Sequence, residues 1–464
     1  MPRRLPALLL AISSATRAEG PVIPATDPVL EGLTRDALAK SPDYARARAD
    51  LGAEQQLIPQ AGALPDPTLA LGIQNDGFHS IKIGVAETSF WQVVVTQPLP
   101  WPGKRTRREE AARAQVGAVE ARVDRIRLTV TADVERTYVD LLLVHDRLDL
   151  LARLENLWRQ AEATVRSRYE VGATPQSDLL RVQLERTRLR QDRIALEVEK
   201  RTAIQALNRL RAHPLDELIP TWRRLTAVPT PALLSVDEAL TDAERRSPDL
   251  ALARRAAIAA DRRVAAAQRD RWPDLSVSAG VMPRGGIEPM WLASVGITLP
   301  VFSKKGSAVA ESEGRRDGEQ QGEEAMRQVV ALRARERQAA LDSALRTLQL
   351  YREGLLIQSN AAVQSTLSQY RVGKVPFISV LEVMRGFLAD EDGYLKALAD
   401  AQRIGIAIRE VSLDAPPGLG TAGGITASSV PGPSESGAAS GTRRVASAAG
   451  GAAQPGAATS SGAM

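Results

Sequence analysis

The chain contains no cysteine among its 464 residues. This absence excludes disulfide bonds, thiol catalysis and cysteine-ligated metal sites, and we expect the protein not to be lipidated at a cysteine. Histidine occurs only three times, at His79, His145 and His213, and these positions have no spacing typical of a metal site. We therefore expect neither a bound metal nor a cofactor.

Aromatic residues are also scarce. They make up 4% of the chain, whereas 25% of the residues are charged, a balance typical of long helices and coiled coils. No segment after the N-terminal region has 18 apolar residues without a charge, so no transmembrane helix is expected. The net charge of +5 is too small for this length to indicate a nucleic-acid partner. Because no nucleophile–base pair and no paired acid is found, we do not expect an enzyme.

The two ends of the chain differ in composition from the rest. Arg3 and Arg4 precede the apolar segment Leu5–Ile12, and small residues then lead to Ala18. This order predicts a signal peptide over residues 1–18 and therefore export. Residues 414–464 are rich in Gly, Ala, Ser, Pro and Thr and are expected to form a disordered tail.

An internal repeat is the strongest signal in the sequence. Four short motifs recur in the same order, with offsets of 200 to 208 residues. The pairs are Ser41-Pro42-Asp43 with Ser247-Pro248-Asp249, Pro65-Asp66 with Pro273-Asp274, Leu99-Pro100 with Leu299-Pro300, and Tyr169–Pro175 with Tyr370–Pro376. We infer a duplication with repeats at 28–211 and 235–411, joined by a proline-rich linker at 212–234.

Each repeat is predicted to contain the same succession of elements. A helix comes first, followed by a β-hairpin and then by a long helical hairpin, in which apolar residues recur with the coiled-coil spacing of about 3.5. The expected ranges are 28–61, 66–98 and 104–211 in the first repeat, and 236–271, 274–300 and 304–411 in the second.

The hairpin strands alternate between apolar and small or polar residues. In the segment Leu275–Val281, for example, Leu, Val and Ala alternate with Ser and Gly, as expected of a strand with two different faces. Strands of about 9–11 residues match a tilted membrane strand, and Trp91 and Trp291 are placed as membrane-interface aromatics. Ordinary soluble hairpins packed on helices are the alternative. Four strands cannot close a barrel, but three chains would supply twelve.

This succession, with its Tyr-x-Val-Gly-x-x-Pro turns, resembles the TolC-type outer-membrane efflux channel family, the outer membrane factors, over residues 28–411. Leu64-Pro65-Asp66-Pro67 and Pro100-Trp101-Pro102-Gly103-Lys104 resemble the heavy-metal cation efflux branch. The resemblance implies a mixed, mainly α, internally duplicated fold. Long coiled-coil hairpins would form an α-barrel tunnel, and four transmembrane strands would contribute to a trimeric 12-stranded β-barrel.

The resemblance also implies a function. The chain would be a passive homotrimeric conduit in the outer membrane with a long periplasmic extension, surrounded by outer-membrane lipid. It would dock with a periplasmic adaptor (membrane fusion) protein and an inner-membrane efflux pump of the RND type. The sequence does not distinguish between metal cations, drugs and proteins as the cargo. An exported coiled-coil scaffold without a pore is the alternative.

The family pattern assigns roles to residues at the two long-hairpin turns. Its periplasmic gate corresponds here to Asp178, Ser379 and Glu382, where carboxylates would attract cations; solvated helix-face carboxylates are the alternative. The turns themselves would dock the adaptor, although any tight helical turn also favours glycine. The docking residues are Tyr169, Val171, Gly172, Pro175, Tyr370, Val372, Gly373 and Pro376.

Overall fold

The computed structural model describes residues 27–220, 223–299 and 304–414. All of these residues belong to one unit, Met1–Leu419, while a second unit, Gly420–Met464, lies outside the described residues. The predicted signal peptide and nearly all of the predicted tail therefore lie outside the described residues as well.

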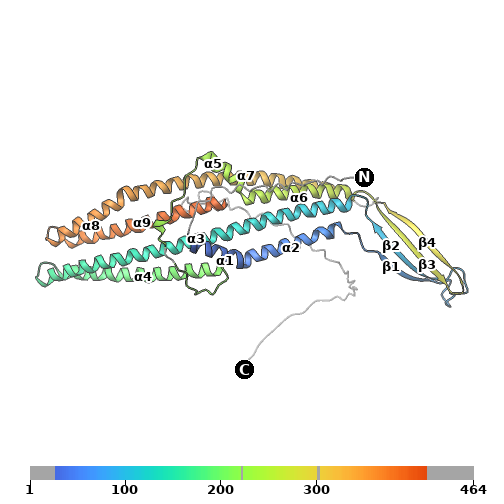
Figure 1. The fold of residues 1–464 in the computed structure, drawn as a ribbon, viewed down its shortest axis with the longest axis horizontal. Coiled ribbons are helices and arrows are strands. Elements are labelled where there is room, and N and C mark those ends of the chain that lie inside the picture. The colour runs from blue at the N-terminus through green and yellow to red at the C-terminus, as the bar shows by residue number, and fades with distance from the viewer. Residues whose placement is uncertain (1–26, 221–222, 300–303, 415–464) are drawn as a thin grey trace, which may run out of the picture. The chain divides into compact units, whose positions relative to one another are not determined.

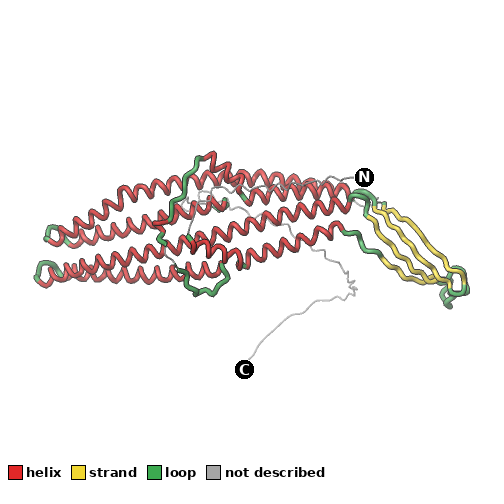
Figure 2. Tube along the Cα trace, viewed as in Figure 1, coloured by secondary structure: helices red, strands yellow, loops and turns green. Residues whose placement is uncertain are grey.

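The described residues form long helices and one four-stranded sheet (Figures 1 and 2). In chain order the elements are α1 (Pro28–Lys40), α2 (Pro42–Gly62), β1 (Thr68–Gln74), β2 (Phe90–Leu99), α3 (Lys104–Glu170), α4 (Gln176–Leu210), η1 (Leu225–Ala227), α5 (Val236–Arg246), α6 (Pro248–Asp270), β3 (Asp274–Arg284), β4 (Ile287–Thr298), α7 (Lys305–Leu350), η2 (Tyr351–Leu355), α8 (Leu356–Arg371) and α9 (Phe377–Glu410).

The first helix of each repeat is divided in two, whereas one continuous helix was expected. The break falls at Ser41 between α1 and α2, and at Ser247 between α5 and α6. Each break precedes a proline at the first helical position, where the missing N–H costs no hydrogen bond. Ser247 also caps α6, because its side chain accepts a hydrogen bond of 3.1 Å from the Leu250 N–H. The Ser-Pro-Asp motif is thus a helix start as well as a repeat marker.

The long helical hairpins agree with the sequence, with one difference. α3 is a continuous helix of 67 residues, whereas its counterpart in the second repeat is interrupted by the π-helical turn η2 between α7 and α8. The main hydrophobic core lies between α3, α4 and α9 and includes the fully buried Leu141, Leu207 and Leu398. No helix in the described ranges is both long enough and apolar enough to cross a membrane.

The four strands form one antiparallel sheet in the order β1-β2-β3-β4, at the end of α2, α3, α6 and α7 (Figure 1). They contain 7, 10, 11 and 12 residues, so β1 is shorter than the expected range. The first hairpin closes through a long loop, but the second closes at Gly285-Gly286. The strand β3 runs on through Pro283 and Arg284 up to this turn.

The register gives the sheet one apolar face, because residues directly opposite each other share a face. Apart from Gln97, this face is formed by Leu69, Leu71, Ile73, Trp91, Val93, Val95, Leu99, Leu275, Val277, Ala279, Val281, Trp291, Ala293, Val295 and Ile297. Leu71, Trp291 and Val295 are between 71% and 79% exposed in the single chain. An apolar face this open requires either lipid or protein to cover it.

The opposite face carries mostly small and polar side chains. The hydroxyl groups of Thr96 and Ser278 lie 2.9 Å apart on this face. Its larger apolar members are Val94 and Leu292 in the middle and Phe90, Met282 and Met290 near the hairpin loops. Its small or polar members are Thr68, Ala70, Gly72, Gln92, Thr96, Ser276, Ser278, Gly280, Ser294, Gly296 and Thr298. The alternation read from the sequence therefore produces two chemically different faces.

A buried carboxylate attaches the linker between the repeats to α3. The Leu225 N–H donates a hydrogen bond of 3.0 Å to Asp146 Oδ2, and Leu225 itself is fully buried. Burial raises the pKa of Asp146 above its ordinary value, although the backbone N–H groups of Thr226 and Leu225 act in the opposite direction. The carboxylate thus positions the linker by accepting backbone hydrogen bonds.

We expect Asp146→Ala to destabilise this attachment by about 1–3 kcal/mol, because buried backbone donors lose their acceptor. Limited proteolysis of the linker, together with thermal unfolding, measures the effect. Asp146→Asn retains a carbonyl acceptor and should cost less. Equal losses in the two variants would show that the hydrogen bonds are not the cause.

Candidate functional site

The two turns that join the long helices have the same geometry. Gly172 lies between α3 and α4 and Gly373 between α8 and α9, both with a φ of 75°. In each turn an N–H bonds back five residues, from Ala173 to the Arg168 carbonyl at 2.8 Å and from Lys374 to the Gln369 carbonyl at 2.9 Å. This left-handed ending is the reason for glycine at both positions.

The predicted docking residues lie at these turns. Val171 and Val372 are 75% and 69% exposed, while Pro175 and Pro376 each precede the first residue of the returning helix. Two exposed apolar side chains on neighbouring turns form a small surface suited to a protein partner. Docking of an adaptor there remains a prediction.

The two tyrosines of the repeated motif differ in their surroundings. Tyr370 is 3% exposed and Tyr169 is 41% exposed. The Arg168 guanidinium lies 5.0 Å from the centre of the Tyr370 ring and donates a hydrogen bond of 2.8 Å to the Tyr370 carbonyl. The Phe377 ring packs edge-on against the Tyr370 ring, with the two ring centres 5.6 Å apart. Arg168 therefore joins the first helical hairpin to the second.

The three residues predicted to form the gate occupy separate environments. Asp178 is buried, and its Oδ2 accepts a hydrogen bond of 2.8 Å from Thr174 in its own turn. Ser379 is half-buried and Glu382 is exposed, both on α9. No hydrogen bond or ion pair joins the three among the described residues. Their action as a gate remains a prediction for the assembled protein.

The structure adds a pair that sequence analysis did not identify. The Arg385 guanidinium of α9 donates to both carboxylate oxygens of Glu185 of α4, at 2.5 and 3.3 Å. Arg188 also donates to Glu185 from one turn further along α4, at 2.5 Å. A bidentate arginine–carboxylate pair fixes both distance and orientation, so this pair sets the spacing of the two returning helices.

Glu185 could have been found from the coiled-coil pattern. It is 8% exposed and lies between Val182 and Leu189, which are also buried, and it follows Asp178 by one heptad. A glutamate in the buried positions of a heptad requires a charged partner. The sequence shows this requirement, but it does not show which of the nearby arginines meets it.

Other ion pairs attach both returning helices to α3. Arg186 of α4 pairs with Glu162, while on α9 Asp392 pairs with Arg147 at 2.7 Å and Arg403 pairs with Asp140 at 2.5 Å. By contrast, Glu185–Arg385 is the only ion pair within the described ranges that joins α4 directly to α9. The seam between these helices thus depends on one cross-link.

Aromatic side chains lie at both ends of the sheet. Trp91 and Trp291, expected at a membrane interface, lie on the apolar face towards the hairpin loops and are 55% and 79% exposed. At the helical end, which sequence analysis missed, Trp101 stacks on Trp272 with ring centres 5.5 Å apart. The Arg269 guanidinium lies 5.4 Å from the Trp272 ring. Aromatics at both borders of an apolar band are typical of membrane strands.

Comparison with solved structures identifies the fold. The chain is similar to the outer-membrane channel OprN, with a TM-score of 0.72 and 19% identity over 84% of this chain and 91% of that chain. It is also similar to CusC, with a TM-score of 0.70 and 18% identity over 83% and 92%. A third match is the open state of the Neisseria gonorrhoeae MtrE channel, with a TM-score of 0.67 and 18% identity over 83% and 89%. The predicted fold class is thereby confirmed.

Two sequence relatives match part of the chain. Nodulation protein T of Rhizobium leguminosarum bv. trifolii is 25% identical over 285 residues, which are 56% of this chain and 57% of that protein. Protein CyaE of Bordetella pertussis is 30% identical over 210 residues, 43% of this chain and 44% of that protein. The chain thus spans about half the length of these relatives.

The family comparison covers most of the chain and falls on the two repeats. The model described as outer membrane efflux protein matches residues 33–213 and 239–412. The break between the two matched segments lies in the linker that contains η1. Because both repeats match, the chain belongs to the outer membrane efflux protein family.

Proposed function

We propose that the chain is the outer-membrane channel of a tripartite efflux system, a passive conduit without enzymatic activity. The two-faced sheet carries this proposal. Its apolar face suits lipid, and its polar face suits a water-filled lumen. Family membership places such a sheet in the outer membrane and the helices in the periplasm.

The edges of the sheet support a homotrimer. Among the described residues β1 and β4 each pair with only one neighbouring strand, and an unpaired edge within a bilayer leaves backbone groups without partners. Three copies joined through β1 and β4 supply twelve strands and leave no edge. The exposed apolar side chains of α4, among them Leu180, Leu184 and Ile194, provide a further surface for a neighbouring copy.

The helices support partners on the periplasmic side. A helix of 67 residues such as α3 spans about 100 Å at about 1.5 Å per residue, which carries the turns far from the sheet. The exposed Val171 and Val372 at these turns are the surface proposed to meet a periplasmic adaptor, which links the channel to an inner-membrane pump of the RND type. The pump supplies the energy for transport, and the channel is the passive route through which the substrate leaves the cell.

The proposed gate lies near the same turns. Asp178, Ser379 and Glu382 are on the first turns of the returning helices α4 and α9, and the Glu185–Arg385 cross-link holds these helices together. Threefold repetition of the carboxylates would place like charges around one axis and attract cations. The intact cross-link holds the proposed gate closed, and loss of the cross-link allows the gate to open.

Within the family, we further propose that the chain belongs to the heavy-metal cation efflux branch. This assignment is supported by the Leu64–Pro67 and Pro100–Lys104 motifs on either side of the first hairpin. Deletion of the chain from its native host should then lower the tolerated concentration of a metal cation. Unchanged metal tolerance combined with drug sensitivity would instead place the chain in a drug-efflux branch.

Extraction of the full chain in detergent from the outer-membrane fraction tests the proposed function. Native mass spectrometry should give a trimer, electron microscopy should give a cylinder at least as long as α3 requires, and planar bilayers should show ion conductance. A monomer or dimer recovered without detergent would overturn the channel and favour the coiled-coil scaffold.

A further inference from the structure

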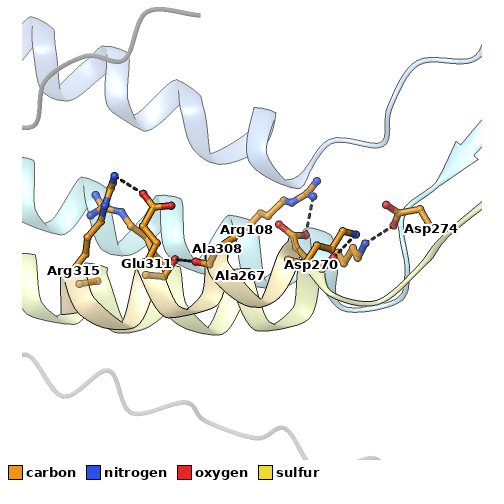
Figure 3. A pocket seen from close by; sticks show the side chains of 12 residues that line it. Arg108, Ala267, Asp270, Asp274, Ala308, Glu311 and Arg315 are labelled. Atoms are coloured by element: carbon orange, nitrogen blue, oxygen red, sulfur yellow. Dashed lines mark hydrogen bonds and ion pairs between the residues drawn. The ribbon is translucent and has the colours of Figure 1, made fainter. Parts of the chain in front are cut away.

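A charged groove lies where the helices meet the sheet. It is bordered by α3, α6 and α7 and has a volume of about 380 Å³ (Figure 3). Three carboxylates line it, those of Asp270, Asp274 and Glu311, against five cationic side chains. The groove therefore has a net charge of +2. The cationic residues are Lys104, Arg108, Arg263, Lys305 and Arg315.

All three carboxylates are already paired. At the sheet end of the groove Lys104 Nζ lies 2.8 Å from Asp274 Oδ1, and Arg108 Nη2 lies 2.8 Å from Asp270 Oδ1 (Figure 3). At the other end Arg315 Nη2 lies 2.6 Å from Glu311 Oε1. These pairs neutralise three of the five cations.

Arg263 and Lys305 keep their full charge. Arg263 donates to the amide oxygen of Gln115 at 2.5 Å, and Lys305 Nζ donates to the backbone carbonyl of Asp270 at 2.8 Å. Neither forms an ion pair with a carboxylate in the part of the chain that the structure describes. Arg263 precedes Asp270, whose carbonyl accepts from Lys305, by seven residues on α6, so the two cationic residues lie along the same side of the groove about two helical turns apart.

The groove opens towards the polar face of the sheet. Asp274 is opposite Thr298 in the register and therefore shares the face of Ser276 and Gly296. Lys104, which is 1% exposed, reaches Asp274 from the first turn of α3. Under the proposed function the polar face lines the lumen, so the groove lies where the helical tunnel enters the barrel.

The charge at Arg263 is not inherited from the duplication, whereas Lys305 has a basic counterpart, Arg105, in the first repeat. Aligning Ser41 with Ser247 places Leu57 of α2 at the position of Arg263, and Glu54 at the position of Ala260. The first repeat therefore lacks the central cation of the groove. A trimer would contain three such arginines and not six, which makes this charge a property of α6 alone.

We propose that this groove binds an anion that carries more than one phosphate or carboxylate group. The Arg263 guanidinium presents parallel donors suited to a bidentate contact with such a group, and Lys305 supplies a mobile point charge at the other end. The inference rests on the proposed function for its position in the lumen. It deepens the general channel function and argues against the heavy-metal branch, since the groove favours anionic cargo and repels free metal cations.

Inorganic tripolyphosphate is a suitable probe, and two measurements use it on the full chain. Calorimetry measures binding to the detergent-solubilised protein, and planar bilayers of phosphatidylcholine measure block of the channel current. We expect both, with binding that weakens as salt is added because the groove is open to water. Arg263→Gln together with Lys305→Gln should weaken binding about tenfold or more, since charge-assisted hydrogen bonds are lost.

Arg107→Gln is the matched control. Arg107 lies one residue from Arg108, outside the groove, and is paired with Glu110 at 2.8 Å. It removes one unit of charge without changing the groove, so binding should stay within about twofold of the unmodified protein. Equal binding by the double variant and the unmodified protein would overturn the proposal, as would an absence of binding.

The two readouts separate the proposals. Binding without any channel conductance would retain the anion site and reject the channel. Conductance without binding would retain the channel and reject the anion site. Because phospholipid headgroups carry the same phosphate chemistry, a final comparison adds phosphatidylglycerol to the bilayer. If that lipid displaces tripolyphosphate from the unmodified protein, the groove is a lipid site and the assignment to cargo is overturned.

Discussion

Val295→Lys should abolish the recovery of trimers from the outer membrane. Val295 is 74% exposed in the single chain and lies near the middle of β4, on the apolar face, opposite Val277. A lysine facing lipid near the bilayer midplane costs about 2–4 kcal/mol, and each trimer would contain three. Fractionation of membranes, followed by electrophoresis of unheated samples, measures the trimer.

Ser294→Lys provides the control. Ser294 is the preceding residue of the same strand, and its side chain lies on the polar face opposite Ser278. A lysine there faces the lumen, so trimers should form and anion conductance should rise. Failure of Ser294→Lys with normal assembly of Val295→Lys would mean that the two faces have been assigned the wrong way round.

Removal of the cross-link between α4 and α9 should have the second large effect. Glu185→Ala removes the buried carboxylate that binds the exposed Arg385, a loss of about 1–2 kcal/mol because one partner of the pair is open to solvent. If the pair holds the closed position, the ratio of open to closed channels rises about tenfold. Single-channel recording on the purified protein measures this change.

Arg188→Ala is the control for this experiment. Arg188 bonds the same carboxylate from within α4, so its removal perturbs Glu185 without separating the helices. Its conductance should remain near that of the unmodified protein. An equal rise in both variants would point to a general loosening of α4, and no rise in either would remove the cross-link from the gate.

The same pair predicts a pH dependence. Burial alone would raise the pKa of Glu185, but the hydrogen bonds and charges of Arg385 and Arg188 outweigh it and hold the pKa below its ordinary value of 4.5. A carboxylate with a lowered pKa stabilises the folded arrangement above its ordinary pKa and loses that contribution as the pH falls through the lowered value. The cross-link should therefore persist through neutral and mildly acidic solution and open only below pH 4.5.

The repeat was the most informative part of the sequence because it constrains distant elements together. Matching Pro65-Asp66 to Pro273-Asp274 indicated that both hairpins begin in the same way, and the register then placed their apolar residues on one face. Alternation alone could not distinguish lipid from a soluble core. The exposure of residues such as Val295 in the folded chain shows that no core within the described residues covers this face, which leaves lipid or another protein to cover it.

What the sequence could not show are contacts between elements that no local pattern joins. The heptad pattern could have marked Glu185 as buried, but its partner Arg385 lies 200 residues away in the sequence. The stacking of Trp101 on Trp272 likewise depends on the junctions after β2 and before β3 meeting in space. The π-helical turn at Tyr351–Leu355 has no counterpart in the first repeat, and no residue pattern marked it.

The two unpaired edges of the sheet have a consequence for how the protein is made. Neither β1 nor β4 has a second strand partner in the part of the chain that the structure describes, so under the proposed trimer the closure of the barrel and the association of subunits are one step. Its stability then depends on subunit concentration, and a newly exported subunit presents an open apolar sheet to water. Below the concentration at which three copies meet, such a subunit can be kept from aggregating only by a chaperone or removed by a protease.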